Sequence, residues 1–172
     1  MGGPVPYGQR DVLFEERRTA THFRSIALIF WAAVVVFAQD GHITPFTGTW
    51  KLNVAKSTFK PGPPFKTFTL TFTPDGTRQL SLTYADGRTL KASLPWSDGT
   101  EVSVAADQGF DGVTAVSKIQ RRTFDDTWKR NGRVIETVHG AVSTDGMTLK
   151  IKVDGTDMQG RAFHNRLTFE KQ

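Results

Sequence analysis

Seven Asp-Gly or Asn-Gly pairs divide the chain from residue 75 onward into short segments of similar length. Consecutive pairs are mostly 9 to 14 residues apart, and they are Asp75-Gly76, Asp86-Gly87, Asp98-Gly99, Asp111-Gly112, Asn131-Gly132, Asp145-Gly146 and Asp154-Gly155. Such pairs accept the positive φ angles of tight hairpin turns, which most residues resist. Their spacing predicts one strand after another, joined by hairpins.

The segments around these pairs alternate apolar and polar residues. The clearest is TFTLTFT, from Thr67 to Thr73, which places Phe68, Leu70 and Phe72 on one face of a strand and four threonines on the other. The same alternation recurs in four further segments, Gln79–Tyr84, Thr89–Leu94, Met147–Val153 and Phe163–Phe169. No window longer than about ten residues after Ala38 shows a helical period.

This pattern predicts an all-β fold, and we expect an antiparallel up-and-down β-barrel of about 8 to 10 strands. Local hairpins in sequence order favour the barrel over a β-sandwich, which is the alternative arrangement of the same strands. A membrane-spanning barrel would need apolar residues on its outer face. The second face of these strands instead carries Thr, Lys and Arg.

The first 38 residues have the pattern of an export signal. A 13-residue apolar run from Ile26 to Ala38 follows three arginines, Arg17, Arg18 and Arg24. The run is shorter than the roughly 20 residues that span a bilayer, so we expect a cleaved signal peptide, with a membrane anchor as the alternative. The expected organisation is a signal peptide at 1–38, a leader at 39–47 and a barrel domain at 48–172, in a periplasmic or secreted protein without a stable membrane span.

The composition excludes several classes of function. The chain has no cysteine, so it forms no disulfide and offers no thiolate to a metal. After Ala38 there are 18 Lys and Arg residues against 14 Asp and Glu residues, a net charge of plus four. These basic residues are scattered rather than interleaved with aromatic residues along a stripe, and we therefore expect no nucleic-acid partner.

The first expected strand begins Gly48-Thr49-Trp50, which resembles the Gly-x-Trp motif that opens the lipocalin barrel. The stretches GTWKLNVAKSTF, DTWKRNGRVIETV and TDGMTLKIKVDGTDMQGRAFHNRLTFEKQ are also similar to small exported bacterial proteins of the lipocalin-like, calycin type. The resemblance implies a barrel that Gly48 and Trp50 close at one end, with an arginine packed on the tryptophan. We assign that arginine to Arg166, and Arg161 is the alternative.

Few residues of the expected barrel could carry chemistry. His139 and His164 lie in expected strands, but no close ligand spacing supports a metal or haem site. Asp125 and Asp126 are adjacent, so an extended strand directs them to opposite faces. The segment 154–157 lacks the remaining ligands of a calcium loop. We therefore expect no catalytic residue, no metal, no cofactor and no enzymatic activity.

The apolar face remains as the candidate site. In one register its inward side chains are Phe68, Leu70, Phe72, Leu80, Leu82, Tyr84, Leu90, Trp128, Leu149, Ile151, Leu167 and Phe169. A small barrel has room either for a filled core or for one small ligand. We expect these residues to line a cavity that binds a small apolar or amphipathic molecule without converting it, with Tyr84 near the opening to orient it. The alternatives are a cell-envelope interaction module with a filled core and, third, a lipocalin-type enzyme.

Overall fold

The computed structural model describes residues 44–62, 65–96, 98–157 and 159–172. The expected signal peptide and the leader up to residue 43 lie outside these residues. Within the described part, no helix combines the length and the apolar character needed to cross a membrane.

Eleven β-strands and one short 3-10 helix, η1 (Val54–Lys56), make up the described fold. The strands are β1 (Gly48–Leu52), β2 (Thr67–Phe72), β3 (Thr77–Thr83), β4 (Thr89–Pro95), β5 (Glu101–Ser103), β6 (Ala105–Ala106), β7 (Val113–Ile119), β8 (Thr123–Arg130), β9 (Arg133–Val142), β10 (Thr148–Thr156) and β11 (Ala162–Lys171). All the pairings between them are antiparallel. The prediction of an all-β, up-and-down antiparallel barrel is confirmed.

The strands form one sheet that rolls up until its ends nearly meet. Their order is β5-β7-β8-β9-β10-β11-β1-β2-β3-β4-β6, so β1 and β11, the first and last strands, are neighbours. The two edge strands, β5 and β6, are separated in the chain only by Val104. Because β5 pairs with β7 and β6 pairs with β4, the segment from Glu101 to Ala106 bridges the two edges of the sheet.

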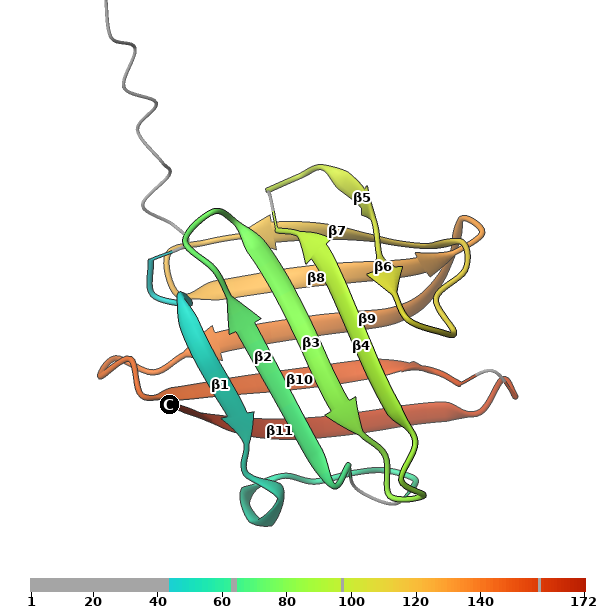
Figure 1. Cartoon of the computed structure of the whole chain (residues 1–172), viewed down its shortest axis with the longest axis horizontal. Coiled ribbons are helices and arrows are strands. Elements are labelled where there is room, and N and C mark those ends of the chain that lie inside the picture. The colour runs from blue at the N-terminus through green and yellow to red at the C-terminus, as the bar shows by residue number, and fades with distance from the viewer. Residues whose placement is uncertain (1–43, 63–64, 97, 158) are drawn as a thin grey trace, which may run out of the picture. The chain divides into compact units, whose positions relative to one another are not determined.

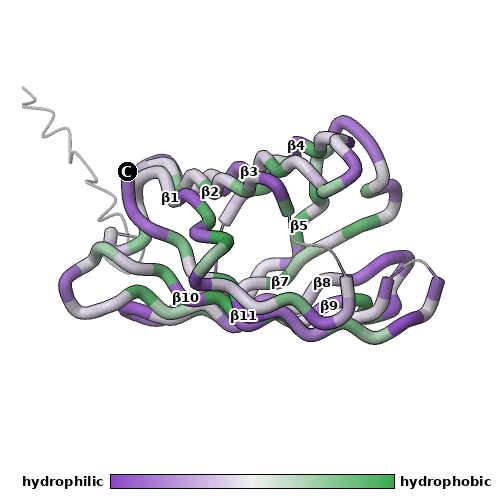
Figure 2. The backbone as a smooth tube through the Cα atoms, turned by 90° about the horizontal axis from the view of Figure 1, so that it is seen from below, coloured by the Kyte–Doolittle hydropathy of each residue, from purple (hydrophilic) through white to green (hydrophobic). Residues whose placement is uncertain are grey.

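The rolled sheet has two faces packed against each other. β1 to β4 form one layer and β7 to β11 form the other, and the strands of the two layers cross steeply (Figure 1). Seen from the side, the two layers enclose the interior of the barrel (Figure 2). A sheet with an apolar inner face reaches this arrangement because rolling buries that face on itself.

The alternation in the sequence sets the register of the strands. In β2 and β3, Phe68 lies opposite Leu82 and Leu70 opposite Leu80, and these side chains all face inward. The turn from β8 to β9 is made by Asn131 and Gly132, with φ angles of 49° and 78°. Two consecutive positive φ angles are the mark of a type I′ hairpin, and Asn-Gly is a preferred pair for it.

The core extends further toward the N-terminus than the expected domain boundary. Phe46, which we placed in the leader, is fully buried at 0 % exposure. Its carbonyl oxygen accepts a hydrogen bond of 2.7 Å from the Trp50 indole nitrogen. The folded domain therefore begins before Gly48, because Phe46 is part of its core.

Candidate functional site

One end of the barrel is closed by four buried aromatic side chains, which we call the aromatic plug: Phe46, Phe72, Trp96 and Phe124. The ring centroids of Phe72 and Trp96 are 4.6 Å apart, and those of Phe46 and Trp96 are 5.0 Å apart. These tilted and edge-to-face contacts are the arrangements that aromatic quadrupoles favour. Since all four side chains are at most 1 % exposed, this end offers no opening.

Trp50 belongs to the closed end, but Arg166 does not pack on it. Arg166 lies exposed on the outer face of β11, where its guanidinium is 3.6 Å from the Asp154 carboxylate. The cation over the Trp50 ring is Lys171, whose ammonium nitrogen is 5.1 Å from the ring centroid. The register explains this correction, because Trp50 of β1 lies directly opposite Lys171 of β11.

The alternative arginine, Arg161, is also exposed and pairs with Asp157 at 2.7 Å. Gly48 has a φ angle of +125°, and a Cβ atom there would come within 3.0 Å of the Lys171 side chain. Gly48 and Lys171 therefore fit together at the closed end beside Trp50.

The opposite end carries five half-buried aromatic residues, which we call the mouth cluster: Phe59, Phe65, Tyr84, Phe110 and Phe163. The Phe65 ring lies 5.8 Å from Phe59, 5.5 Å from Phe68 and 5.7 Å from Tyr84, centroid to centroid. These rings pack against the core yet keep part of their surface in water. Apolar surface that stays in contact with water is the kind that an apolar ligand can cover.

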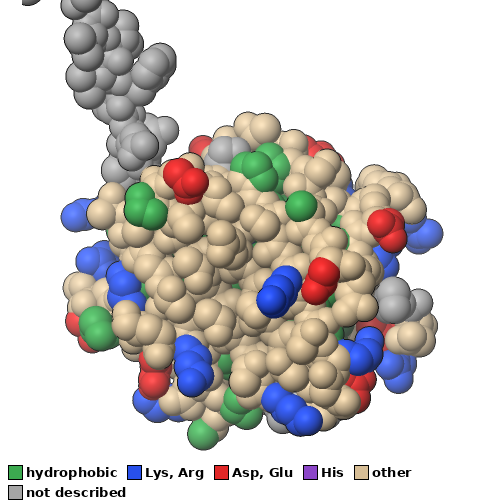
Figure 3. Space-filling view, in the orientation of Figure 1, with side chains coloured by type: hydrophobic (Ala, Val, Ile, Leu, Met, Phe, Trp, Pro, Cys, Tyr) green, Lys and Arg blue, Asp and Glu red, His purple; other side chains and the backbone are tan. Residues whose placement is uncertain are grey.

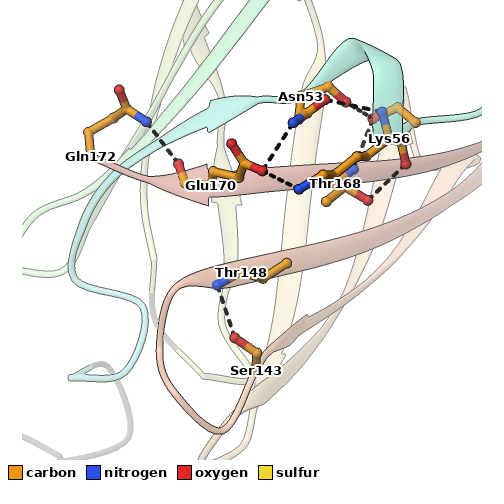
Figure 4. A network of polar contacts seen from close by, with 8 residues as sticks. Asn53, Lys56, Ser143, Thr148, Thr168, Glu170 and Gln172 are labelled. Carbon is orange, nitrogen blue, oxygen red and sulfur yellow. Dashed lines mark hydrogen bonds and ion pairs between the residues drawn. The ribbon is translucent and has the colours of Figure 1, made fainter.

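Phe59 comes from the connection between β1 and β2, and hydrogen bonds hold this connection to β11. Glu170 accepts from the Asn53 amide at 3.0 Å and from the Lys56 ammonium at 2.8 Å (Figure 4). The Thr168 hydroxyl donates to the Lys56 carbonyl at 3.1 Å (Figure 4). Further along, the backbone N–H of His164 donates to the Lys60 carbonyl at 2.6 Å. Hydrogen bonds to β11 therefore hold the chain both before and after Phe59, which fixes this residue at the mouth.

The interior contains a buried ion pair that alternation alone does not predict. Arg78 of β3 and Asp126 of β8 face each other with Nη1 and Oδ2 2.6 Å apart, and their side chains are 4 % and 1 % exposed. The guanidinium carbon lies 5.6 to 5.8 Å from the ring centroids of Trp96, Phe124 and Trp128. An arginine among three aromatic rings is stabilised by cation–π attraction in addition to its ion pair.

The pair leaves several buried polar atoms without a hydrogen-bond partner among the described residues. They are Nε and Nη2 of Arg78, Oδ1 of Asp126, and the indole nitrogens of Trp96 and Trp128. Buried polar groups in native proteins are almost always satisfied, by protein atoms or by water. The region around this ion pair is therefore polar, and four hydrogen-bond donors and one acceptor in it have no partner among the described residues.

Glu136 of β9 extends the polar region toward the mouth. It lies opposite Trp128 on β8 and opposite Gly155 on β10, on the inner face of the barrel. The Glu136 side chain is half-buried, and the pKa of its carboxyl is raised from 4.5 to about 7, first by loss of solvation and then by the Asp126 carboxylate, while the Arg78 guanidinium opposes the shift. Burial also raises the pKa of the nearby Tyr84 phenol, and the Glu136 charge adds to that rise.

The twelve predicted lining residues all belong to the core or pack against it. Ten are buried, and Leu80 and Tyr84 are half-buried. Phe72 belongs to the aromatic plug, while Tyr84 belongs to the mouth cluster and Phe68 contacts it through Phe65. The list thus divides into residues beside the aromatic plug and residues beside the half-buried mouth cluster at the opposite end.

The histidines and the outer carboxylates lie outside the barrel. His139 bonds Asp125 at 2.7 Å and His164 bonds Asp154 at 2.8 Å, all four side chains facing solvent. As expected from their adjacency, Asp125 faces outward while Asp126 faces inward. Within the described residues, no three His, Asp or Glu side chains come close enough to hold a metal ion.

A hollow of about 560 Å³ lies against the outer surface of β2, β3, β4 and β6. Its lining combines hydroxyl and amide side chains, namely Thr69, Thr71, Gln79, Ser81 and Ser93, with apolar residues such as Ala92, Ala105 and Ala106. The view onto β1 to β4 shows mostly uncharged polar side chains and backbone, with a basic and an acidic side chain next to each other within this face (Figure 3). It is an open groove rather than a closed pocket, and the charged residues Lys91 and Asp107 also line it.

The sequence analysis missed Arg78, Asp126, Glu136 and Trp96 as interior residues. The signal for two of them is visible in retrospect: Arg78 is in phase with Leu80 and Leu82, and Asp126 is in phase with Phe124 and Trp128. A charged residue on the apolar phase of a strand indicates either an outward twist or a buried partner. Arg78 and Asp126 each lie on the apolar face of their own strand and have opposite charges, so the sequence is compatible with a buried ion pair between them.

Comparison with known proteins places the fold but not a family. No protein-family model matches the chain, and no curated protein sequence matches it. Among solved structures, a variant of the fluorescent protein UnaG superposes with a TM-score of 0.50 at 14 % identity, covering 76 % of this chain and 98 % of that one. The wild-type UnaG structure gives 0.48 at 13 % identity, covering 76 % and 99 %. The zebrafish ileal bile acid-binding protein in complex with cholic acid gives 0.45 at 10 % identity, covering 74 % and 99 %. The described domain shares with the UnaG variant the fold of a calycin-type antiparallel β-barrel.

Proposed function

We propose that the protein is a carrier or receptor that binds a small amphipathic molecule at the mouth of the barrel, without converting it. The observation that carries this proposal is the set of buried, unpaired hydrogen-bonding atoms around Arg78 and Asp126, inside a barrel whose mouth is lined by half-buried aromatic rings. A core that only stabilises the fold gains nothing from unsatisfied polar atoms, each of which costs on the order of 1–3 kcal/mol. A ligand with an apolar body and a polar end would use both features.

The binding energy would come mainly from burial of apolar surface. Ligand and mouth-cluster surface removed from water contribute roughly 25 cal/mol per Å². The polar interior would orient the ligand, because a few polar groups in an apolar site fix the binding pose. The resemblance to exported lipocalin-like proteins supports a periplasmic or secreted location, and the proposal assigns no enzymatic activity.

A second candidate function follows from the outer hollow. Its hydroxyl-rich lining on β2, β3 and β4 would suit a polar partner docking on the sheet, as in the interaction module considered from the sequence. This candidate uses the opposite face of the same strands. The two functions can therefore be separated by substitutions at neighbouring positions.

Leu80→Trp and Ser81→Trp form such a matched pair. Leu80 is half-buried on the inner face of β3, and Ser81 is exposed on its outer face within the hollow. The assay is fluorescence titration with N-phenyl-1-naphthylamine, an uncharged apolar probe, with native mass spectrometry after solvent extraction to identify any retained compound. We expect the wild-type protein and Ser81→Trp to bind the probe and Leu80→Trp to lose it, with circular dichroism confirming that both variants fold. Equal binding by all three, or no binding by the wild type, would contradict the inner site.

A further inference from the structure

Glu136 is an inward-facing carboxyl without a bonded partner. Among the described residues, no hydrogen bond or ion pair involves its side chain, whereas Asp126, its inner-face neighbour, has Arg78 at 2.6 Å. Glu136 is half-buried by accessible surface, and charged side chains that are withdrawn from water are normally paired. The Glu136 carboxyl therefore lacks the cation that its position calls for.

The surroundings of Glu136 are aromatic and partly open. Its cross-strand neighbours are Trp128 on β8 and, on β10, Gly155, which has no side chain to fill the space. The Phe163 ring reaches over Gly155, since a Cβ atom there would lie 2.7 Å from the Phe163 ring. Tyr84 lies close enough for its charge to interact with that of Glu136. Three aromatic residues thus flank one carboxyl at the inner edge of the mouth.

Charged and titratable groups near Glu136 come from several strands. Arg78 on β3 and Asp126 on β8 act on the carboxyl directly. Tyr84, at the end of β3, is also influenced by Arg88 and Asp86, which pair with each other at the surface at 2.7 Å. On β10 and β11 the charged and titratable groups nearest in sequence are Asp154 and His164, which bond each other on the outer face. Inside the barrel the Arg78 and Asp126 charges cancel, so an ionised Glu136 leaves one uncompensated negative charge.

This arrangement disfavours a carboxylate ligand. The only guanidinium in the described interior, that of Arg78, is already paired with Asp126 and is 4 % exposed. A second carboxylate near Glu136 and Asp126 would add like charge in a poorly solvated place, which is unfavourable. A cation would instead neutralise the interior and could also lie against the aromatic ring faces.

We propose that the ligand of this barrel is an amphipathic amine, whose ammonium group pairs with the Glu136 carboxylate among Trp128, Tyr84 and Phe163 while its apolar body covers the mouth cluster. This inference rests on the proposed ligand-binding function and specifies the chemical class of the ligand. Glu136 is the residue that determines specificity, since it alone supplies the unpaired charge.

Three ligands with the same ten-carbon chain test the inference: decylamine, decanol and decanoate. Isothermal titration calorimetry on the full protein at pH 8, below the micelle concentration of each, measures the three dissociation constants. We expect decylamine to bind at least about tenfold more tightly than decanol, and decanoate to bind more weakly than decanol, because a charge-assisted pair is worth more than about 1.4 kcal/mol. Glu136→Gln should lose that tenfold preference and keep decanol binding within about twofold, as the volume of the side chain is unchanged.

The matched control is Glu101→Gln, since Glu101 lies on the surface and pairs with Lys129 at 2.7 Å. This variant should bind all three ligands as the wild type does. Lowering the pH provides a second readout, because burial raises the pKa of Glu136 to about 7 and the amine binds the ionised carboxylate. Decylamine affinity should fall as the pH decreases from 8 to 6 in the wild type and stay constant in Glu136→Gln.

The outcomes separate the two proposals. Decanol binding without a preference for decylamine, or a decylamine preference that survives in Glu136→Gln, would overturn the assignment to an amine while leaving the ligand-binding function in place. Tightest binding of decanoate would overturn it in the same way. Absence of binding for all three ligands would overturn the proposed function and this inference together.

Discussion

The buried Arg78–Asp126 pair makes a quantitative prediction that depends on both partners. Removing one member of a buried ion pair leaves an uncompensated charge and costs about 3–5 kcal/mol. Both side chains are at most 4 % exposed, so solvent cannot compensate either charge by itself. We therefore expect Arg78→Met and Asp126→Leu each to lower the free energy of unfolding by about that amount.

The double variant Arg78→Met, Asp126→Leu is expected to behave differently from the sum of its parts. Replacing a buried pair by apolar residues of similar size is often neutral or stabilising by about 1–4 kcal/mol. The double variant also removes three of the five unpaired buried atoms, Nε and Nη2 of Arg78 and Oδ1 of Asp126. We expect the double variant to be at least as stable as the wild type, which corresponds to a coupling free energy of about 6 kcal/mol or more.

Equilibrium unfolding in urea, followed by tryptophan fluorescence, measures all four proteins, and Trp96 and Trp128 lie beside the guanidinium as local reporters. Additive losses in the double variant would refute the reasoning. So would a nearly neutral Asp126→Leu, because Arg78 would then be stabilised mainly by the three aromatic rings around it rather than by the carboxylate.

Three further predictions concern single positions. Glu136→Gln should raise the free energy of unfolding at pH 8 and flatten its pH dependence. The Glu136 carboxyl has a pKa of about 7 in the folded protein and a reference value of 4.5, so the folded state binds more protons than the unfolded state. The stability of the wild type therefore falls as the pH rises from 4.5 to 7, by at most about 3 kcal/mol. Thermal unfolding of both proteins from pH 4.5 to 8 measures this, and equal slopes would contradict it. Gly140→Ala should cost about 1–3 kcal/mol or more, because its Cβ would lie 2.1 Å from the buried Phe124 ring, and adding Phe124→Leu should recover part of that loss in a urea titration. Phe46→Ala should cost about 3–5 kcal/mol in the same titration, and a loss under 1 kcal/mol would mean that the folded domain does not need Phe46.

Much of the fold could be predicted because its determinants are local. The alternation of Thr67 to Thr73 fixes which residues of β2 face inward, and the Asp-Gly and Asn-Gly pairs fix where hairpins turn. The order of these hairpins predicted most of the sheet, since most strands pair with their neighbour in sequence; the exceptions are the pairs β1–β11, β4–β6 and β5–β7. Local physics specifies the strands and hairpins without reference to distant parts of the chain, whereas the pairing of β1 with β11 is a long-range contact.

The features that could not be predicted depend on contacts between distant strands. Arg78 and Asp126 belong to β3 and β8, which are not neighbours in the sheet, so their approach depends on how the barrel closes. The cation over Trp50 follows from the register of β1 against β11, which selects Lys171 rather than Arg166.

Glu136 was hidden by the sequence of β9 itself. Val134 and Ile135 are both apolar at adjacent positions, and the register shifts beside them, between Trp128 and Lys129 on the neighbouring strand. From Glu136 to Val142 the pairing is regular, and Glu136 lies in phase with Val138, Gly140 and Val142, so its inward direction follows from the period only when Gly140 is counted as an inward position. Sequence alternation identifies an inward side chain only where the strand pairing is regular.

The half-buried, unpaired Glu136 carboxyl affects both the stability of the protein and its expected affinity for an amine. A carboxyl that is desolvated and unpaired lowers the stability of the empty barrel above its reference pKa, and an isosteric amide would remove that cost. The same carboxyl gains most from a cation that reaches it, because its charge is poorly compensated beforehand. Glu136→Gln should therefore raise stability and lower decylamine affinity in the same protein, both effects growing from pH 6 to pH 8. A residue with only a packing role would not couple these two measurements, since its substitution would change stability without a pH-dependent change in amine binding.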